Sequence, residues 1–363
     1  MKTLMLIAGG TGGHIFPAFH IAEHASQNNW KVIWVSGFHG LENQIKAPTF
    51  LTHERIDMSG FRGKSLIAKT KGLYAVLPAM IRSLMLIKKH QPDVVICMGG
   101  YLSLPAGLAA WISRKPLCLH ESNTRVGLSN RLLSPFAKHC FLGFDIPGYK
   151  KKTLITGNPL SSQLKTKKPL QVTKFDSKRP LKILLIGGSR GAKKINDSLM
   201  DALVDADFNE ASSLNIWHQT GSTFEISKKT IQIIQKNCFA YQNHAFIDDM
   251  PEAYEWADCI ICRSGAMTTS EIEKIALPAI FIPYPHAIDN HQYHNASTLA
   301  DQKRAWIIEE KDLSKTLLQQ RLKKILHQPE ILKNMHKKSL KANKNTLAQH
   351  MIVDICQQLT QKT

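Results

Sequence analysis

The chain has 363 residues, which corresponds to two domains at about 150 residues each. Its 43% hydrophobic and 21% charged residues exclude small disulfide-stapled, fibrous and disordered classes of protein. The 47 Lys and Arg residues outnumber the 28 Asp and Glu residues and give a net charge of +19, which favours an anionic partner such as nucleic acid, an acidic membrane surface or a phosphorylated substrate.

The positions of the charged residues and the cysteines indicate which half binds an anionic partner and whether the thiols are oxidised. Residues 1–157 contain 19 basic and 7 acidic side chains, whereas residues 158–363 contain 28 basic and 21 acidic side chains. The first half is therefore the better candidate to bind an anionic surface. The seven cysteines lie in apolar runs, which indicates free thiols in a reducing cytosol. Cys259 and Cys262 form a C-x-x-C pair without the further ligands of a metal site, so we expect no metal there.

Short apolar runs in the first half alternate with longer amphipathic stretches, which is typical of a doubly wound parallel α/β fold. The N-terminal apolar run is too short for a signal peptide, which predicts synthesis in the cytoplasm. Residues 94–113 carry no charge, but glycines and Pro105 divide them into strand, turn and helix rather than a membrane span. We predict strands at Thr3 to Ala8, Val32 to Ser36, Val94 to Met98, Leu117 to His120 and Cys140 to Leu142.

The pattern changes between Lys150 and Pro180, where Lys, Thr, Pro and Ser dominate without periodicity. We therefore place a domain boundary near Gly157 with a linker beyond it. A second α/β series follows, with strands predicted at Leu181 to Ile186, Leu214 to Gln219, Cys259 to Cys262, Ala279 to Ile282 and Ala305 to Ile308.

Both halves open with a strand that leads into a glycine turn, at residues 4–14 and 183–192. Glycines let the backbone approach a ligand, and the following helix offers free N–H groups and a positive dipole end to an anion. Two such turns facing across a cleft predict sites for a donor and an acceptor.

The commoner nucleotide motifs do not fit these turns. Ile15 stands where a dinucleotide fingerprint needs its third glycine, and the second strand ends at Ser36 rather than in an acidic residue. Residues 63–65 end like a P-loop, but Met58 occupies the place of its first glycine. The sequence therefore argues against NAD and against ATP hydrolysis.

Nine motifs follow one another along the chain: GGTGGHIFPA (9–18), GGY (99–101), HESN (120–123), GNP (157–159), GGSRGA (187–192), HQTG (218–221), FIDDM (246–250), CRSGAMTTSE (262–271) and HQYHNA (291–296). Together they resemble the MurG family, UDP-N-acetylglucosamine transferases that convert lipid I into lipid II in bacterial peptidoglycan synthesis. The resemblance covers essentially the whole chain.

The resemblance implies a GT-B fold, in which two Rossmann-like domains face each other across a cleft. It also implies that a C-terminal helix, here from about Thr346 to Gln358, returns to the N-terminal domain. The predicted acceptor-binding and membrane-associating domain is thus residues 1–157 with about 341–363, and the predicted UDP-GlcNAc-binding domain is residues 158–340.

Donor contacts are expected in the second domain. Ser264, Gly265 and Ala266 follow an apolar strand and open a helix, so their N–H groups can face the diphosphate. The resemblance places Glu271 on the ribose diol, because a carboxylate accepts two hydrogen bonds. The other donor contacts that it implies are Ser189 on phosphate, Arg263 beside the departing UDP, Ile247 on uracil through its backbone, Gln292 on the sugar hydroxyls, and Met267, Thr268, Thr269 and Ser270.

Three positions depart from the family pattern. Arg190 replaces a usual glutamine, Ser161 stands where an arginine commonly follows GNP, and His291 replaces the first of a paired glutamine. The missing arginine at 161 removes one expected donor contact, for which Arg190 can compensate by charge.

Acceptor contacts are expected in the first domain. The family transfers GlcNAc with inversion, without a covalent intermediate and without a metal held by a D-x-D motif, so we expect no cofactor. His14 is the candidate base, because an imidazole titrates near neutrality, although phosphate binding or helix capping is the alternative role. Glu121 is the second candidate base, or the group that orients it. The resemblance implies further contacts at Thr11, Gly12 and Gly13 with the sugar and the lipid diphosphate, at Gly100 and Tyr101 with the acceptor, and at Asn123 and Asn130 with sugar hydroxyls.

A lipid acceptor implies a peripheral enzyme at the cytoplasmic face of the bacterial inner membrane. Residues 69–89 combine apolar side chains with basic flanks, which fits an interfacial helix on anionic lipid, aided by Trp111. The alternative is a core helix kinked at Pro78. The apolar residues are Leu73, Tyr74, Val76, Leu77, Met80 and Ile81, and the basic residues are Lys69, Lys71, Arg82, Lys88 and Lys89.

Two other functions remain open. Another UDP-sugar GT-B enzyme, such as a glycolipid synthase or a UDP-GlcNAc epimerase, would share the fold, but HESN, FIDDM and AMTTSE argue against it. A non-catalytic nucleic-acid-binding protein would explain the charge, but no recognition motif or aromatic platform is present, so we expect no nucleic-acid partner. Other cell-wall synthesis and division proteins are expected partners of a lipid II-forming enzyme.

Overall fold

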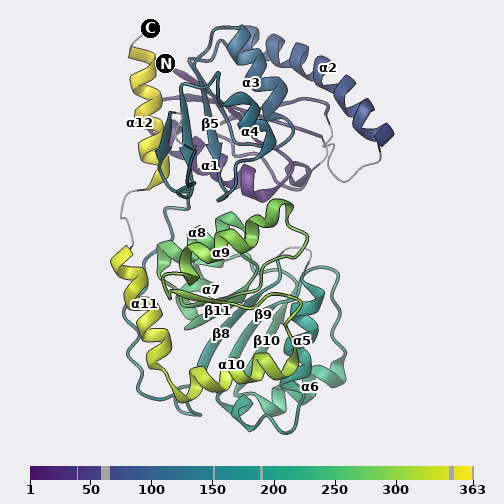
Figure 1. Cartoon of the computed structure of the whole chain (residues 1–363), viewed down its shortest axis with the longest axis vertical. Coiled ribbons are helices and arrows are strands. Elements are labelled where there is room, and N and C mark those ends of the chain that lie inside the picture. The colour runs from purple at the N-terminus through teal and green to yellow at the C-terminus, as the bar shows by residue number, and fades with distance from the viewer. Residues whose placement is uncertain (39, 59–65, 150–151, 189–190, 343–346, 362–363) are drawn as a thin grey trace. The chain divides into compact units, whose positions relative to one another are not determined.

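The computed structural model of the chain describes residues 1–363 except 39, 59–65, 150–151, 189–190, 343–346 and 362–363, and it describes residues 66–75 by their backbone. The chain divides into two compact units, which are Met1–Ser161 with Asn345–Thr363, and Ser162–Lys344 (Figure 1). Both contain a parallel sheet with covering helices, which confirms the predicted doubly wound α/β class.

The first unit contains a seven-stranded parallel sheet in the order β3-β2-β1-β4-β5-β6-β7. The strands are β1 Thr3–Ile7, β2 Lys31–Ser36, β3 Thr52–Arg55, β4 Val94–Cys97, β5 Leu117–Glu121, β6 His139–Leu142 and β7 Thr153–Ile155. The helices are α1 Gly12–Gln27, α2 Leu66–His90, α3 Ser103–Ile112, α4 Leu128–Leu133 and α12 Ala348–Gln361.

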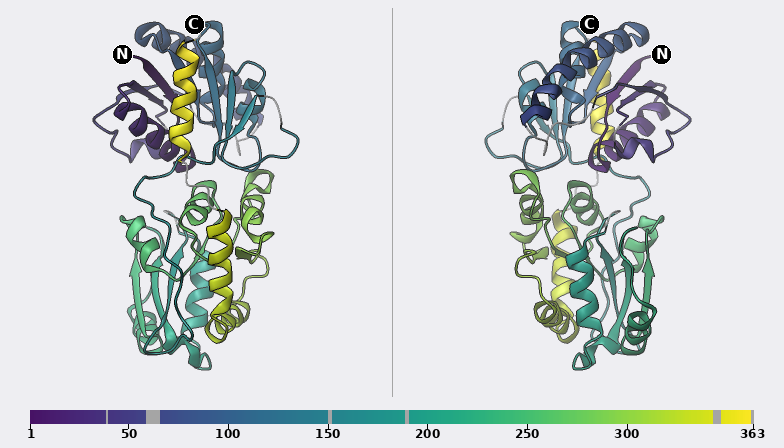
Figure 2. Two further views of the ribbon diagram at one scale, coloured as in Figure 1. Left: turned by 90° about the vertical axis from the view of Figure 1, so that its left-hand side faces the viewer. Right: turned by 90° about the vertical axis from the view of Figure 1, so that its right-hand side faces the viewer.

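Alternate strand residues of the first unit build two cores, one on each face of the sheet. Met5 and Ile7 belong to a core with α2 and α3, whereas Leu4 and Leu6 belong to a core with α1 and α12. Side chains on a strand point alternately to its two faces, so one apolar run serves both cores. Figure 2 shows α12 along the first unit, where it contacts α1. This helix begins at Ala348, and Thr346 lies outside the described residues.

The second unit contains a six-stranded parallel sheet in the order β10-β9-β8-β11-β12-β13. The strands are β8 Leu181–Ile186, β9 Leu214–Gln219, β10 Ala240–His244, β11 Cys259–Cys262, β12 Ala279–Phe281 and β13 Ala305–Ile307. The helices are α5 Lys193–Leu203, α6 Lys228–Asn237, α7 Met250–Trp256, α8 Ala266–Ile275, α9 His291–Ala300, α10 Lys315–His327 and α11 Glu330–Ala342.

The segment before β8 corrects the predicted linker. Residues 162–180 form neither helix nor strand, but Val172 and Phe175 are buried in the core of the second unit. The Lys167 N–H also donates to the Ile275 carbonyl at 2.9 Å. The polar composition concealed this packing, because two apolar side chains suffice to anchor the segment.

The uncharged stretch from Val94 forms β4, a turn and α3, which confirms the prediction of a buried α/β element. Among the described residues, none of the helices combines the length and the apolar character needed to cross a membrane.

Each sheet reverses its strand order at one point, between β1 and β4 in the first unit and between β8 and β11 in the second. In open α/β sheets, ligands bind outside the carboxyl ends of the strands at this point. The glycine turns after β1 and β8, and the motifs after β4 and β11, all lie there. The topology thus places most of the predicted motifs at two equivalent edges.

Candidate active site

Buried Glu42 organises the glycine turn after β1. This residue lies in a short 3₁₀ turn, Leu41–Asn43, and its side chain is fully buried. Its Oε2 accepts the Gly10 N–H at 2.8 Å, and its Oε1 accepts the Tyr101 hydroxyl at 3.2 Å. Burial and this carboxylate raise the pKa of Tyr101, so the phenol remains a donor. The hydroxyl of Tyr101, expected on the acceptor, is thus directed at Glu42.

His14 in the first turn of α1 lies against the glycine turn that follows β4. Gly99 and Gly100 have φ values of +94° and +79°, which disfavour other residues. A Cβ atom at either position would lie 3.2 Å from a ring nitrogen of His14. The His14 Nδ1 is also 3.4 Å from the Thr11 Oγ1.

Burial lowers the pKa of His14, while the negative charge of Glu121 opposes this shift. The imidazole is therefore neutral at pH 7, which is the form that accepts a proton. Once it is protonated, the charge of Glu121 stabilises the imidazolium.

Glu121 at the end of β5 is 7% exposed and accepts hydrogen bonds on both oxygens. Its Oε1 accepts from the backbone N–H and the Nδ2 of Asn123 at 3.1 and 3.3 Å. Its Oε2 accepts from the Gly127 N–H at 2.8 Å and the Asn130 Nδ2 at 3.0 Å. These hydrogen bonds tie the loop after β5 to the start of α4. The geometry favours a fixed charge near His14 over a second base.

Asn130 on α4 links the loop to the strand. Its Nδ2 donates to the His120 carbonyl at 2.9 Å as well as to Glu121. Its Oδ1 is buried and finds no hydrogen-bond partner among the described residues, so it remains available to a ligand hydroxyl or a water. Burial lowers the pKa of neighbouring His120 to about 3, so this imidazole is neutral as well.

The turn after β11 presents the start of α8 in the second unit. Gly265 precedes the helix, and a Cβ atom there would meet no atom within 4 Å. The Ser264 Oγ donates to the Gln292 carbonyl at 2.8 Å, and the Asn295 Nδ2 donates to the Ser264 carbonyl at 3.2 Å, which fixes the turn. The first turn of α8 contains no acidic residue, so its N–H groups suit an anion.

Glu271 on α8 is held by one hydrogen bond. The hydroxyl of Tyr254, on α7, donates to its Oε2 at 2.7 Å. Burial raises the pKa of Glu271, and the bond from Tyr254 opposes the rise. The other oxygen, Oε1, makes no hydrogen bond within the described residues and can accept from a ligand.

Ile247 follows β10, and its N–H donates to the side-chain Oε1 of Gln219 at 3.0 Å. The uracil contact predicted for this backbone is therefore limited to its carbonyl, unless Gln219 moves. Four other predicted donor residues lie on α8, where Thr269 and Ser270 are buried while Met267 and Thr268 are half-buried. Ser189 and Arg190 lie outside the described residues.

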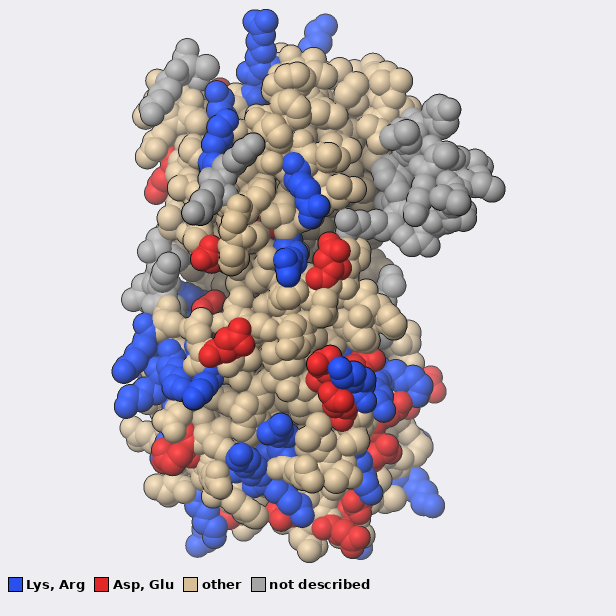
Figure 3. Space-filling model, in the orientation of Figure 1, with Lys and Arg blue, Asp and Glu red and all other residues tan. Residues whose placement is uncertain are grey.

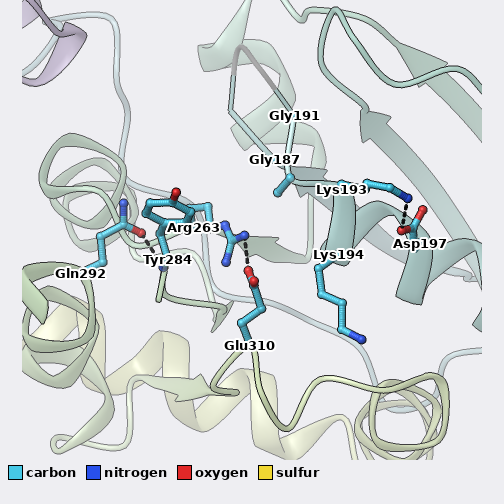
Figure 4. A pocket seen from close by; sticks show the side chains of 10 residues that line it. Gly187, Gly191, Lys193, Lys194, Asp197, Arg263, Tyr284, Gln292 and Glu310 are labelled. Atoms are coloured by element: carbon cyan, nitrogen blue, oxygen red, sulfur yellow. Dashed lines mark hydrogen bonds and ion pairs between the residues drawn. The ribbon is translucent and has the colours of Figure 1, made fainter. Parts of the chain in front are cut away.

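A pocket of about 520 Å³ opens beside the turns after β8 and β11 (Figure 4). Gly187, Gly191, Ala192, Lys193, Lys194, Asp197, Arg263, Tyr284, Gln292 and Glu310 line it. The Gln292 Oε1 accepts the Tyr284 N–H at 3.0 Å, and Arg263 forms an ion pair with Glu310. Two predicted residues, Arg263 and Gln292, thus share this pocket, whereas Ile247 and Glu271 lie outside its lining.

The described side chains do not assemble a metal centre: no group of three or more His, Cys, Asp or Glu among them could hold an ion. Burial raises the pKa of Cys259 to about 12 and that of Cys262 further. Both groups are therefore neutral thiols at pH 7 in the metal-free chain.

Sequence reasoning missed Glu42 and Tyr254. Each makes its contact across a long sequence separation, from Glu42 to Tyr101 and from Tyr254 to Glu271. The acidic residue after β2 in an otherwise basic half was a weak signal for Glu42. No local pattern distinguishes Tyr254 from an ordinary helix residue.

Comparison with known proteins agrees with this geometry. Residues 4–142 match the glycosyltransferase family 28 N-terminal domain, and residues 182–351 match the C-terminal domain of the same family. A Coxiella burnetii protein named UDP-N-acetylglucosamine--N-acetylmuramyl-(pentapeptide) pyrophosphoryl-undecaprenol N-acetylglucosamine transferase is 38% identical over 97% of both chains. A protein of the same name from Psychromonas ingrahamii is 37% identical over 99% of both.

A solved structure extends the likeness to three dimensions. The crystal structure of Acinetobacter baumannii MurG has a TM-score of 0.80 and 30% identity, and the match covers 99% of this chain and 100% of that one. The chain therefore belongs to glycosyltransferase family 28 and, within it, to the MurG family of N-acetylglucosaminyltransferases.

Proposed function

We propose that the chain transfers GlcNAc from UDP-GlcNAc to the 4-hydroxyl of MurNAc in lipid I, forming lipid II and UDP. The observation that carries the substrates is 38% identity over 97% of both chains to a transferase whose name states this donor and acceptor. The proposed chemistry rests on the neutral imidazole of His14, which lies where the strand order of the first sheet reverses, between β1 and β4.

The reaction is a single displacement. The bond from the anomeric carbon to the UDP oxygen breaks while the bond to the acceptor oxygen forms, and the acceptor proton passes to a base. We assign the base role to His14. Glu121 is the fixed charge that stabilises the resulting imidazolium, and Asn130 offers its unpaired Oδ1 to a sugar hydroxyl.

The second unit holds the donor in this proposal. The first turn of α8 directs N–H groups at the diphosphate, where negative charge increases as UDP departs. Glu271, oriented by Tyr254, accepts the ribose hydroxyls on its free oxygen. Gln292 uses its Nε2 toward the sugar, since its Oε1 is already bonded.

The transfer assay is the direct test. Purified protein is incubated with labelled UDP-GlcNAc and a short-chain lipid I analogue, with and without EDTA. We expect labelled disaccharide lipid and UDP in equal amounts, with no effect of the chelator. UDP release with another acceptor, or epimerised UDP-sugar without any acceptor, would leave the fold in place and discard the proposed substrate.

Apolar side chains on the first unit support peripheral attachment to the inner membrane. Leu77, Ile81 and Met85 recur every four residues on α2 and are 58%, 45% and 56% exposed, while Val76 and Met80 pack against the core. Trp111 is 51% exposed. On the face shown in Figure 3, much of the first unit lacks charged side chains. The structure describes only the backbone of four further residues predicted on this surface, which are Lys69, Lys71, Leu73 and Tyr74.

A vesicle-binding assay tests this attachment. We expect sedimentation with anionic phospholipid vesicles to fall when Ile81 and Met85 are both replaced by Glu, since charge on the lipid side opposes insertion. Transfer to a water-soluble acceptor analogue serves as the control and should persist. Unchanged vesicle binding would contradict the assignment of this surface.

A further inference from the structure

Five of the described side chains that line the pocket of the second unit are charged. Arg190, in the neighbouring turn, lies outside the described residues. Of the five, Lys193, Lys194 and Arg263 are basic, whereas Asp197 and Glu310 are acidic. The pairing of these charges decides which cation remains available to an anionic ligand.

Two of the three cations are already neutralised. Lys193 forms an ion pair with Asp197 at 2.7 Å along α5, and both side chains are exposed. Arg263 is more deeply engaged, because its guanidinium pairs with Glu310, donates to the carbonyls of Ile282 and Pro283 at 3.1 Å each, and lies 5.5 Å from the centre of the Tyr284 ring. Figure 4 shows both pairs joined by dashed lines.

Lys194 is the remaining cation among the described residues that line the pocket. Its ammonium group makes no ion pair or hydrogen bond with any described residue, and Figure 4 draws it without a partner. It is the second residue of α5, directly after the glycine turn, so its charge adds to that of the helix N-terminus. Gly187 and Gly191 line the same pocket and expose backbone there.

Gly187 and Gly191 pack too tightly against neighbouring backbone to carry a side chain. A Cβ atom at Gly187 would lie 2.5 Å from the Ala192 nitrogen, and one at Gly191 would lie 2.4 Å from the Thr220 carbonyl oxygen. Gly191 also has φ of +75°. Lys194 lines the same pocket with an ammonium group that has no partner among the described residues, and such a group suits an anionic ligand.

We propose that Lys194 binds the diphosphate of the donor nucleotide, and that Glu310 confines Arg263 to a framework role by neutralising its charge. The inference rests on the proposed function for the identity of the donor. It reassigns the charge contact predicted for Arg263, whose guanidinium is directed at Glu310 and two carbonyls.

The test is the affinity of the full chain for UDP and for uridine, measured by calorimetry. We expect Lys194→Met to weaken UDP binding about tenfold or more, because a hydrogen bond to a charged group is lost, and to leave uridine binding unchanged. Lys193→Met is the matched control on the same helical turn, and it should change UDP affinity by no more than about twofold, since exposed ion pairs contribute little.

A second variant tests the part assigned to Glu310. In the Lys194→Met background, Glu310→Gln removes the partner of Arg263, so we expect UDP affinity to recover in part. Equal losses in the two lysine variants, an equal loss of uridine affinity, or no loss in Lys194→Met would each overturn the role of Lys194. No recovery with Glu310→Gln would overturn the role of Glu310.

These results are distinguishable from failure of the proposed function. If UDP binding depends on Lys194 but no GlcNAc reaches lipid I, the proposed acceptor is wrong and the role of Lys194 stands. If transfer occurs and Lys194→Met binds UDP normally, the role of Lys194 alone is wrong. If the unaltered chain does not bind UDP, both proposals are contradicted.

Discussion

Two glutamates, Glu121 in the first unit and Glu271 in the second, lie near equivalent edges of similar sheets but in opposite circumstances. Glu121 accepts hydrogen bonds from four N–H groups and has both oxygens occupied. Glu271 accepts from one hydroxyl and keeps an oxygen free. The difference teaches that a carboxylate at a ligand-binding edge is not by itself a ligand contact. A carboxylate that accepts hydrogen bonds from many N–H groups holds a loop in place, whereas one with few donors remains available to substrate.

The same contrast extends to the units as a whole. Buried carboxylates in the first unit, Glu42 and Glu121, hold the loops that surround His14. In the second unit, the Ser264 hydroxyl and the Asn295 amide hold the turn before α8, and Glu271 stays accessible. We therefore expect changes in the first unit to affect catalysis and folding, and changes in the second to affect donor affinity.

The largest expected effect is that of His14→Ala. Removing a general base costs about 10²- to 10⁴-fold in turnover, and we expect this loss with UDP affinity within about twofold of the original. Steady-state transfer at saturating donor and UDP calorimetry provide the two readouts. A parallel loss of UDP affinity would instead favour phosphate binding by His14.

The second-largest expected effect is that of Glu121→Gln, which should lower the stability of the fold. The neutral amide loses charged hydrogen bonds and turns its own NH₂ group toward N–H donors, so we expect the free energy of unfolding to fall by about 2 to 4 kcal/mol. Urea unfolding measures the change. The isosteric control is Glu271→Gln, for which about 1 kcal/mol or less is expected; equal losses would remove the contrast between the two glutamates.

Glu271→Ala should weaken UDP binding about 10- to 100-fold, through the loss of hydrogen bonds from the ribose hydroxyls to the Glu271 carboxyl group. Tyr254→Phe should have a smaller effect in the same direction, since it removes only the group that orients the carboxylate. Calorimetry with UDP and with a 2′,3′-dideoxy analogue separates the contributions, because the analogue should not respond to either change. A response of the analogue would place Glu271 elsewhere on the donor.

The pH dependence of stability is spread over both units rather than set by one residue. His120 and His218 are buried, and burial lowers the pKa of each to about 3. Because the unfolded chain binds protons near pH 6.5 and the folded chain does not, stability is full above pH 6.5 and declines toward pH 3. Each histidine contributes a slope of up to about 1.4 kcal/mol per pH unit.

Urea midpoints between pH 7 and pH 5 measure this decline. Replacing His218 by Gln should reduce the slope by up to about 1.4 kcal/mol per pH unit, even if it also lowers stability at pH 7, since Tyr241 and Asn196 lose a partner. An unchanged slope would show that other groups control acid unfolding.

Sequence patterns predicted the central strands well and the edges poorly. The strand predicted at Leu181 to Ile186 is β8 without adjustment, because a strand buried on both faces forms a continuous apolar run. The strands β3, β7 and β10 were not predicted. All three lie at sheet edges, where one side is open to solvent and polar residues such as those of Ala240–His244 are tolerated.

The sequence motifs predicted several residues of the candidate site, but not the hydrogen bonds and ion pairs that those residues form. Glycine turns and the start of α8 have local signatures, so the sequence indicated His14, Gly265 and Glu271. The pairing of Arg263 with Glu310 depends on residues 47 positions apart, and no spacing rule connects them. Hydrogen-bond partners of this kind are fixed only when the sheet brings distant strands together.

The pH profile of transfer at saturating donor tests most directly that the first unit supplies the base. Because burial lowers the pKa of His14 below its ordinary value of 6.5, we expect the rate to be constant near neutrality and to fall only at pH values below 6.5. This acidic decline should be absent from the residual activity of His14→Ala. The same decline in both proteins would contradict the assignment of His14 as the group that receives the acceptor proton.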